Sequence, residues 1–367
     1  MSLKTRSVIA YQLGLAGAPC VTSSFQTEGV VLLHMCNTTR ASWAPVAQQL
    51  SAAGIHALTV DNRGFGESAD AADNKSPQEQ AAVRQKWPAD FDAVFAYLVS
   101  QPGVDKARIG AGGGSCGVMN AVRLASRHPE VRSLVLLAGP TDGAGINYLL
   151  QNPWIPIFTA AAADDQFSAT APQEMQWLAD IGGNPRNQFM GFPDGKHGTE
   201  IFGPHPELPK AITAFFVETL VKSPADSKKK IAVMNTPARQ FWMAVAEPGG
   251  ATKAAQTYRD ARSRDPKSYL FSEAALNLVG YERLQQDRNQ EAIELFKLNT
   301  EANPASANVY DSLADGYIAL GQSAEALAAE QRCLELLPAD KGAEEFKRQL
   351  RQTAEEKLMK LKEQAGN

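Results

Sequence analysis

Short apolar runs alternate with amphipathic stretches from about residue 29 to residue 222. Nearly continuous apolar runs of this length are typical of strands buried on both faces of a sheet. They predict strands at residues 30–33, 56–60, 108–111, 131–137, 155–160 and 188–191. The intervening stretches repeat apolar residues at helical spacing and predict helices at residues 42–53, 89–99, 118–127, 172–179 and 208–221. This order indicates an α/β domain whose mostly parallel sheet carries helices on both faces.

The alternation of strands and helices ends near Lys222. A polar stretch follows, with Ser223, Pro224 and a run of lysines at residues 228–230. A stretch of this composition is typical of a linker. We therefore predict that the α/β domain spans residues 1–222 and the linker residues 223–246, and that a small all-α domain occupies residues 247–367.

The all-α domain contains a repeated pattern. Pro304 and Pro338 lie 34 residues apart, and an alanine that follows a glutamate stands 12 positions before each of them, at Ala292 and Ala326. This period resembles the tetratricopeptide repeat, a helical hairpin that packs or binds and does not catalyse. The second copy is the closer match, because Arg283 replaces the usual tyrosine in the first. An ordinary helical bundle with accidental similarity is the alternative.

Repeat arrays of this kind need about three stacked units to cover their apolar faces. Two copies are visible here, with an extra helix at residues 251–263 and a charged capping helix at residues 344–363. We therefore expect the tail to pack closely against the α/β domain or against a second copy of the chain, which favours a homodimer. Binding of a separate protein partner through the repeats is the other possibility.

Composition and charge exclude several classes of function. Of the 367 residues, 44% are hydrophobic and 21% are charged, so the chain can bury a core and is not intrinsically disordered. The net charge of −4 provides no basic excess to neutralise phosphates, which argues against a nucleic acid partner. No apolar run is long enough to predict a membrane span.

The cysteines give no sign of a metal or of a disulfide framework. Cys20, Cys36, Cys116 and Cys333 lie far apart, and no C-x-x-C pair occurs. We predict neither a structural metal nor a cofactor. The chain as given reads as a cytoplasmic protein, but its start at Met1 is also compatible with a leader that replaces a removed signal peptide. The sequence therefore leaves a periplasmic or secreted location open.

A glycine-rich turn between a predicted strand and a predicted helix carries the strongest chemical signal. It contains a G-x-S-x-G motif with Ser115 flanked by Gly113 and Gly117. In such a nucleophile elbow, small residues allow a sharp turn that presents the hydroxyl at the tip of the sheet. Ser115 is the predicted nucleophile. Cys116 is an alternative, but it would place Val118 where the turn needs a small residue.

Two other interpretations of these glycines compete with the elbow. Gly112, Gly114 and Gly117 also spell G-x-G-x-x-G, which matches a dinucleotide-binding fingerprint. That motif belongs near the start of its domain and needs an acidic residue at the end of the following strand. Here the motif follows two earlier strands, and the next strand ends without an acid. A turn that serves packing alone is the second alternative.

Residues 29–68 resemble the N-terminal half of an α/β hydrolase. In that family one strand ends in a His-Gly turn, and a later strand ends in D-x-R-G-x-G-x-S. Here His34 begins the first turn, with Met35 where glycine is usual, and residues 61–68 supply the second motif, which we interpret as structural. The resemblance extends to about residue 221. It implies a doubly wound sheet of the α/β-hydrolase type, as in serine esterases and dienelactone-hydrolase-like proteins.

The resemblance also implies a triad in the order nucleophile, acid, histidine. The family's acid loop is matched by the residues after the fifth predicted strand, where Asp165 is favoured and Asp164 is second. The histidine is His197, in a loop similar to the family's G-x-G-H with Lys196 replacing the second glycine. His205 is the alternative.

Two backbone donors complete the implied site. The N–H groups of Cys116 and of Cys36, or of Met35 in its place, are expected to form the oxyanion hole, without participation of the cysteine side chains. The interval from Ala138 to Ile155 is too short for a large lid, so we expect an open site. The predicted protein is a serine hydrolase for an ester or related small-molecule acyl substrate, with peptides and thioesters open. An inactive scaffold acting through its repeats is the alternative.

Overall fold

The computed structural model describes residues 11–12, 26–69, 76–340 and 344–365. The chain divides into two compact units, residues 1–236 and residues 237–367. The first residues, where the sequence is compatible with a leader, lie outside the described residues. Among the described residues, no helix is both long and apolar enough to cross a membrane.

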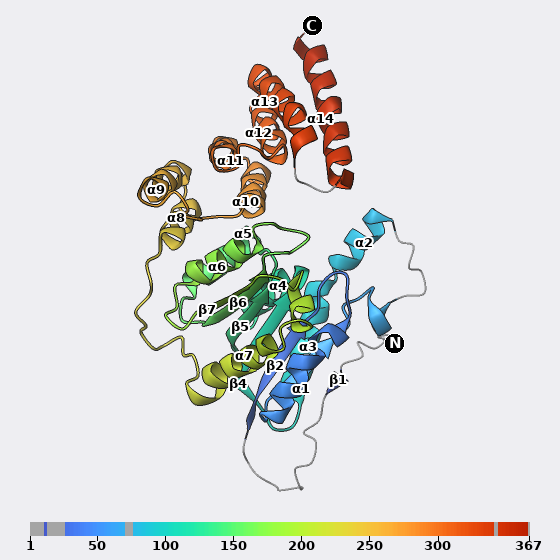
Figure 1. Ribbon diagram of the computed structural model, residues 1–367, viewed down its shortest axis with the longest axis vertical. Coiled ribbons are helices and arrows are strands. Elements are labelled where there is room, and N and C mark those ends of the chain that lie inside the picture. Colours follow the sequence, from blue (N-terminus) through green and yellow to red (C-terminus); the bar gives the residue numbers. More distant parts are fainter. Residues whose placement is uncertain (1–10, 13–25, 70–75, 341–343, 366–367) are drawn as a thin grey trace. The chain divides into compact units, whose positions relative to one another are not determined.

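The first unit is built on a seven-stranded sheet in the order β1-β3-β2-β4-β5-β6-β7 (Figure 1). All neighbouring strands are parallel except β1 and β3. The strands are β1 (Tyr11–Gln12), β2 (Thr27–Leu33), β3 (His56–Val60), β4 (Val104–Gly114), β5 (Val131–Leu137), β6 (Ile157–Ala162) and β7 (Gln188–Phe192). The predicted mostly parallel α/β sheet is therefore confirmed. Strand β1 was not predicted, because two residues carry no periodicity.

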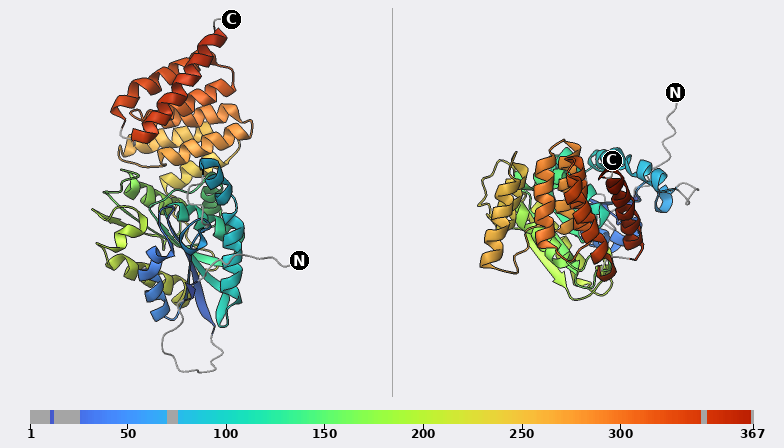
Figure 2. Two further views of the ribbon diagram at one scale, coloured as in Figure 1. Left: turned by 90° about the vertical axis from the view of Figure 1, so that its right-hand side faces the viewer. Right: turned by 90° about the horizontal axis from the view of Figure 1, so that it is seen from above.

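Helices cover both faces of this sheet (Figures 1 and 2). Helices α1 and α7 pack together on one face, whereas α3, α4, α5 and α6 pack in succession on the other. Their bounds are α1 (Ala44–Ala52), α3 (Trp87–Ser100), α4 (Cys116–Arg127), α5 (Gly143–Gln151), α6 (Ala171–Gly182) and α7 (Glu207–Phe216), which continues as a wider turn over Val217–Lys222; a further helix is α2 (Pro77–Arg84).

Helices α2 and α5 were not predicted from the sequence. Helix α5 contains Gly143 and Gly145, and glycine disfavours a helix by about 1 kcal/mol relative to alanine. Its first turn is stabilised by Asp142, whose side chain accepts a hydrogen bond from the N–H of Gly145 at 2.9 Å. The interval between β5 and β6 therefore holds a short capped helix.

The core under α1 and α7 follows the two-residue alternation of the strands. Val30 and Leu32 of β2 point to the same face as Val135 and Leu137 of β5, where they meet Trp43. The other members of this core come from β3, β6, β7 and the two helices, and include Val46, Leu50, Ala57, Phe158, Ala160, Phe192, Leu208, Phe215 and Phe216. The packed sheet provides a rigid base for the loops at its carboxyl edge.

The second unit is entirely helical in its described residues, as predicted. Consecutive helices pack in pairs, α8 with α9, α10 with α11 and α12 with α13, and α14 packs on α13. The helices are α8 (Pro237–Ala246), α9 (Ala251–Arg264), α10 (Glu273–Gln285), α11 (Asn289–Ala302), α12 (Asn308–Ala319), α13 (Ser323–Leu336) and α14 (Glu344–Ala365). Helices α11 and α13 begin at equivalent positions of the two sequence copies, and the comparison with tetratricopeptide repeats stays a prediction.

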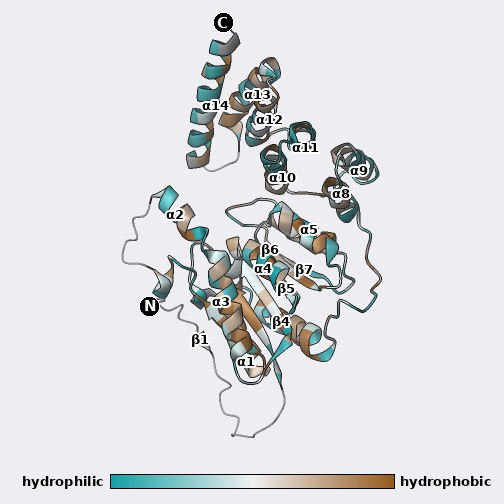
Figure 3. Cartoon of the chain, turned by 180° about the vertical axis from the view of Figure 1, so that it is seen from behind, coloured by the Kyte–Doolittle hydropathy of each residue, from teal (hydrophilic) through white to brown (hydrophobic). Residues whose placement is uncertain are grey.

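The boundary between the units differs from the predicted linker. The structure places it between Thr236 and Pro237, so that part of the expected linker forms helix α8. The buried Phe241 and Trp242 explain the difference, because they anchor α8 in the core of the second unit. The predicted charged capping helix corresponds to α14, which is hydrophilic over much of its length (Figure 3).

Candidate active site

Ser115 lies at the sharp turn between β4 and α4. Its backbone adopts φ 54° and ψ −124°, a left-handed conformation that costs a side-chain-bearing residue about 1–3 kcal/mol. The turn is held by a hydrogen bond of 2.9 Å from the N–H of Ser115 to the carbonyl of Leu137, at the end of β5. Backbone strain that the neighbouring structure maintains at one serine is the geometry expected of a nucleophile elbow.

The glycines of the motif are required by close backbone approach. A Cβ on Gly113 would overlap the carbonyl of Gly117, and a Cβ on Gly117 would lie 2.5 Å from the carbonyl oxygen of Leu33 in β2. Both positions therefore tolerate only glycine without a backbone shift. Moving the turn by one residue, as a Cys116 nucleophile requires, would place Val118 in the crowded position.

Cys36 and Cys116 form a disulfide, with their Cα atoms 5.8 Å apart. The spacing of the cysteines indicated no disulfide, and this expectation was wrong. The two residues are 80 positions apart in the chain, and only the pairing of β2 with β4 brings them together. A bonded sulfur cannot form the thiolate that attacks a carbonyl, so Cys116 in this state is no nucleophile.

The loop after β2 is ordered by His34. Its Nδ1–H donates to the carbonyl of Met35 at 2.6 Å, and its Nε2 accepts the N–H of Asn62 at 2.9 Å. Burial lowers the pKa of His34, which favours the neutral ring that this pair of hydrogen bonds requires. Within the described chain, no acceptor takes the backbone N–H of Cys36 or of Cys116. Both groups remain available as hydrogen-bond donors.

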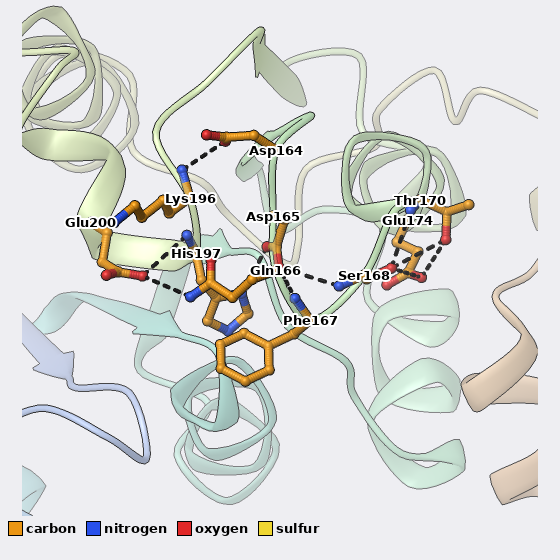
Figure 4. Close-up of polar contacts among 10 residues, drawn as sticks. All are labelled: Asp164, Asp165, Gln166, Phe167, Ser168, Thr170, Glu174, Lys196, His197 and Glu200. Carbon is orange, nitrogen blue, oxygen red and sulfur yellow. Dashed lines mark hydrogen bonds and ion pairs between the residues drawn. The ribbon is translucent and has the colours of Figure 1, made fainter. Parts of the chain in front are cut away.

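Asp165 and His197 are in direct contact (Figure 4). The Nδ1–H of His197 donates to Oδ2 of Asp165 at 2.7 Å, and both side chains are almost fully buried. The other carboxylate oxygen of Asp165 accepts the N–H groups of Phe167 and Ser168 at 2.8 and 3.3 Å. These contacts fix the carboxylate and leave Nε2 of the ring free to accept a proton.

Asp164 binds the backbone of the histidine loop. Its side chain accepts the N–H of Lys196 at 2.8 Å, so it anchors the loop that carries His197 without touching the ring (Figure 4). Lys196 adopts φ 61°, the left-handed region in which glycine is favoured. The lysine thus occupies the backbone conformation of the glycine that the resemblance leads one to expect there. Glu200 connects the same two loops, because it accepts hydrogen bonds from Gln166 and from the N–H of His197.

The turn of Ser115 and the loop of His197 approach the same residues. The carbonyl of Leu137, which accepts the N–H of Ser115, lies 3.7 Å from the position of a Cβ on Gly198. A Cβ on Gly114 would likewise touch Thr199 at 3.5 Å. The hydroxyl of Ser115 makes no direct hydrogen bond to the His197 ring in this structure. Catalytic hydrogen bonds are often long before substrate binds, so this geometry is compatible with a serine and histidine pair.

The remaining histidines lie in other environments. His205 contacts Asp194 at 2.7 Å and Glu207 at 3.0 Å. Desolvation opposes the charged ring, but these two hydrogen bonds raise the pKa of His205 above its usual value. His128 bonds Asp92 at 2.9 Å and stacks on Phe95. Burial lowers the pKa of His56 on β3. None of these rings touches Asp165, so the structure provides no support for His205 as the alternative.

Phe167 is a site residue that the sequence did not reveal. Its ring lies 4.6 Å from the ring of His197 in an edge-on orientation, and 66% of its surface is exposed (Figure 4). A phenylalanine directly after an acidic loop carries no periodic signal, so only the fold shows this proximity.

Potential metal ligands gather in the second unit. One ligand atom each of Asp311, Glu330 and Cys333 lies within 4.8 Å of the others. The Nζ of Lys357 is 2.9 Å from Asp311 and 3.3 Å from Glu330. This ammonium group is bonded to the acidic side chains and would repel a metal cation. The cluster is therefore best described as a buried ion-pair network.

The fold of the first unit is that of the α/β hydrolases. Residues 29–199 match the family model described as "alpha/beta hydrolase fold". This match, together with the parallel sheet and the elbow, favours the hydrolase interpretation of the glycine-rich turn over a dinucleotide-binding one. No curated protein matches the chain.

Several solved structures show similarity to part of this chain. The esterase Pf2001 of Pyrococcus furiosus is 21% identical over 53% of this chain and 84% of its own, with a TM-score of 0.41. Est1E of Butyrivibrio proteoclasticus, solved with ferulic acid, is 15% identical over 57% and 94%, with a TM-score of 0.44. Acetyl xylan esterase 1 of a Thermoanaerobacterium species is 14% identical over 54% and 76%, with a TM-score of 0.39.

Proposed function

We propose that the first unit is a serine hydrolase that cleaves an ester or a related acyl compound through Ser115, His197 and Asp165. The observation that carries this proposal is the buried contact of 2.7 Å between Asp165 and His197. The residues directly after His197 approach the strained turn of Ser115, since a Cβ on Gly114 would touch Thr199 at 3.5 Å. Packing of the loops alone would not require a buried carboxylate to orient the imidazole. The α/β-hydrolase fold supports the assignment.

In the proposed reaction, the hydroxyl of Ser115 attacks the acyl carbonyl while Nε2 of His197 takes its proton. The ring then returns this proton to the departing alcohol, and an acyl-enzyme remains. Water hydrolyses the acyl-enzyme with the same help from His197. Asp165 keeps the proton on Nδ1 and stabilises the charged ring, because its carboxylate is held by two backbone N–H groups.

The oxyanion that develops during attack needs preorganised donors. The N–H groups of Cys36 and Cys116 are proposed for this role, because both are free of other acceptors and both follow strand ends that pair in the sheet. Removal of one such donor typically costs about 3 kcal/mol of barrier. No cofactor enters the proposed chemistry.

The proposed substrates are esters of short acids with an apolar alcohol. The interval between β5 and β6 holds only the short helix α5, which argues against a large lid in that place. The exposed ring of Phe167 beside His197 offers an apolar contact for a leaving group. The helical tail is proposed to serve packing or partner binding.

Hydrolysis of p-nitrophenyl acetate and butyrate tests the proposal. We expect turnover by the full chain and a loss to near background in Ser115→Ala, because the attacking atom is removed. Labelling with a fluorophosphonate probe, followed by peptide mapping, should place the adduct on Ser115. A folded protein that neither turns over nor reacts at Ser115 would be a scaffold that acts through its helical unit.

A further inference from the structure

We propose that the disulfide between Cys36 and Cys116 is a positioning element of the oxyanion hole. It links the two residues whose backbone N–H groups are proposed to bind the oxyanion, and its loss is expected to lower kcat with little change in KM. This inference rests on the proposed serine hydrolase function, and the experiments below separate the failure of one from the failure of the other.

The position of the disulfide follows from the register of the sheet. Leu33 at the end of β2 pairs with Gly113 near the end of β4. Cys36 and Cys116 lie equally far beyond this pair, one on the loop after β2 and the other at the first residue of α4. The covalent bond therefore connects the loop and the elbow directly beside Ser115.

The two donors differ in how the rest of the fold holds them. The elbow is fixed on one side by β4 and on the other by the hydrogen bond from Ser115 to Leu137. The loop after β2 is fixed by hydrogen bonds to Leu33, His34 and Met35.

Within the described chain, no hydrogen bond reaches Cys36 itself or the exposed Asn37 that follows it. The turn around these two residues is closed by the N–H of Thr38, which donates to the carbonyl of Met35 at 3.3 Å. The disulfide is the attachment that links Cys36 itself to the elbow.

A fixed donor matters because the oxyanion hole acts through preorganisation. Donors that already face the developing charge need no reorganisation when the tetrahedral intermediate forms. If the loop could move, the N–H of Cys36 would have to be reordered in each transition state, whereas ground-state substrate binding would change little. A defect of this kind appears in kcat rather than in KM.

Both half-cystines are partly exposed, so a reagent can reach the bond. A water-soluble phosphine reduces it with a simple balance: the phosphine and one water molecule give the phosphine oxide, and the disulfide takes up two electrons and two protons to become two thiols. Both backbone N–H groups remain in the reduced protein. Disulfides persist in oxidising compartments and are opened in the reducing cytosol, so full turnover is expected under oxidising conditions.

The first experiment compares the full chain with its Cys36→Ala, Cys116→Ala and double variants on p-nitrophenyl butyrate. We expect kcat to fall about tenfold in each variant, while KM stays within about twofold. The affinity for an aryl trifluoromethyl ketone, which forms a tetrahedral adduct with Ser115, should fall in proportion to kcat. Cys333→Ala, which removes a buried free cysteine of the second unit, is the matched control and should leave all three quantities unchanged.

The second experiment treats the unchanged protein with the phosphine and measures kcat before reduction, after reduction and after reoxidation. Circular dichroism and the melting temperature report whether the fold persists. We expect a reversible fall in kcat at an assay temperature where the reduced protein is fully folded. This experiment decides the matter if the alanine variants fail to fold.

Each outcome either supports or overturns the inference. Peptide mapping that finds Cys36 and Cys116 as free thiols in the oxidised protein would overturn it, as would an unchanged kcat after complete reduction. Unfolding upon reduction would assign the bond a purely structural role and also overturn it. If the oxidised protein has no turnover that depends on Ser115, the proposed function itself fails. If that turnover exists but is indifferent to reduction, only the inference fails.

Discussion

The backbone of Ser115 is strained, and the surrounding structure maintains this strain. Its φ of 54° and ψ of −124° are natural for glycine and costly for any residue with a Cβ. The hydrogen bond to Leu137 and the close backbone approach at Gly113 and Gly117 hold the turn in this conformation. At the scale of one residue, stability and the proposed activity are therefore in conflict.

This conflict predicts the behaviour of two variants. Ser115→Gly should raise the free energy of unfolding of the first unit by roughly 1 kcal/mol, because the strain is relieved, and should abolish ester hydrolysis. Ser115→Ala keeps the Cβ and should abolish hydrolysis with almost no change in stability. Thermal unfolding and p-nitrophenyl butyrate turnover measure both. A destabilised glycine variant would show that the turn is not strained in solution.

The acid loop after β6 and the histidine loop after β7 act as one structural element. Asp165 bonds the ring of His197, Asp164 bonds the backbone of Lys196, and Glu200 connects the two loops from the other side. The two adjacent carboxylates thus bind different groups. Asp165 orients the ring of His197, whereas Asp164 orients the backbone next to it. The distinction matters for which variant damages the proposed reaction.

We predict that Asp165→Asn lowers kcat by about a thousandfold or more, because an amide in place of the carboxylate stabilises the wrong imidazole tautomer. Asp164→Asn should change kcat by less than about threefold, since its amide oxygen can still accept the N–H of Lys196. Steady-state kinetics of the two variants, compared at equal folded fraction, checks the ranking. The reverse order would transfer the role of the triad acid to Asp164.

The second unit contains a buried charge network where α12, α13 and α14 meet. Lys357 lies 2.9 Å from Asp311, 2.6 Å from Asp315 and 3.3 Å from Glu330. Burial and the nearby Asp311 raise the pKa of Glu330 to about 8. Burial likewise raises the pKa of Asp311. The carboxylates raise the pKa of Lys357 against the effect of burial, so Lys357 stays charged at neutral pH.

The sign of the pH effect follows from proton binding. Between its ordinary value of 4.5 and about 8, Glu330 holds more proton in the folded than in the unfolded chain. Stability must therefore fall as pH rises through this window, by roughly 1–3 kcal/mol from pH 5 to pH 8. The contribution of Lys357 to the free energy of unfolding does not change in this window. The pKa of Lys357 is raised, so this contribution is lost only above the usual pKa range of lysine.

Glu330→Gln should remove much of this slope of the free energy of unfolding against pH, since the amide stays neutral at every pH. Amide hydrogen exchange of α13 and α14 at pH 5 to 8, corrected for intrinsic rates, measures it. Glu335→Gln on the exposed side of the same helix is the control and should keep the slope. A slope that persists in the Glu330 variant would assign it to another group.

At the scale of the whole molecule, each of the two units has its own core. Helices α1 and α7 close a core over the sheet, whereas Ile293, Phe296 and Ala314 lie in a core within the helical unit. All the residues proposed for the chemistry belong to residues 1–236. The unit that carries the proposed activity is therefore separable in principle from the unit that is proposed to pack or bind.

Expression of residues 1–236 alone tests this separation. We predict hydrolysis that depends on Ser115, with kcat/KM within about threefold of the full chain, because the core, elbow and loops are all retained. Light scattering and the melting temperature report whether the shortened protein aggregates, as expected if the tail covers an apolar surface. A fragment that is folded but inactive would show that the helical unit supports the site.

The sequence by itself determined the features that depend on local pattern. Apolar runs of strand length located β2 to β7, because strands buried on both faces need continuous apolar residues. The small residues around Ser115 located the sharp turn, because only glycine permits the backbone contacts that such a turn makes. The absence of strand patterns after about residue 246 predicted a helical tail, and the described residues of the second unit are helical.

Only the tertiary structure decided the features that depend on distant contacts. The disulfide joins Cys36 to Cys116 across 80 positions, and no local pattern records that β2 and β4 are neighbours. Contact of His197 with Asp165 rather than with Asp164 depends on the direction in which each side chain leaves its loop. The proximity of Phe167 to His197 and the burial of Phe241 and Trp242 in α8 likewise depend on tertiary contacts. Local spacing limits which residues can form each element, and packing of the whole chain selects which of them meet.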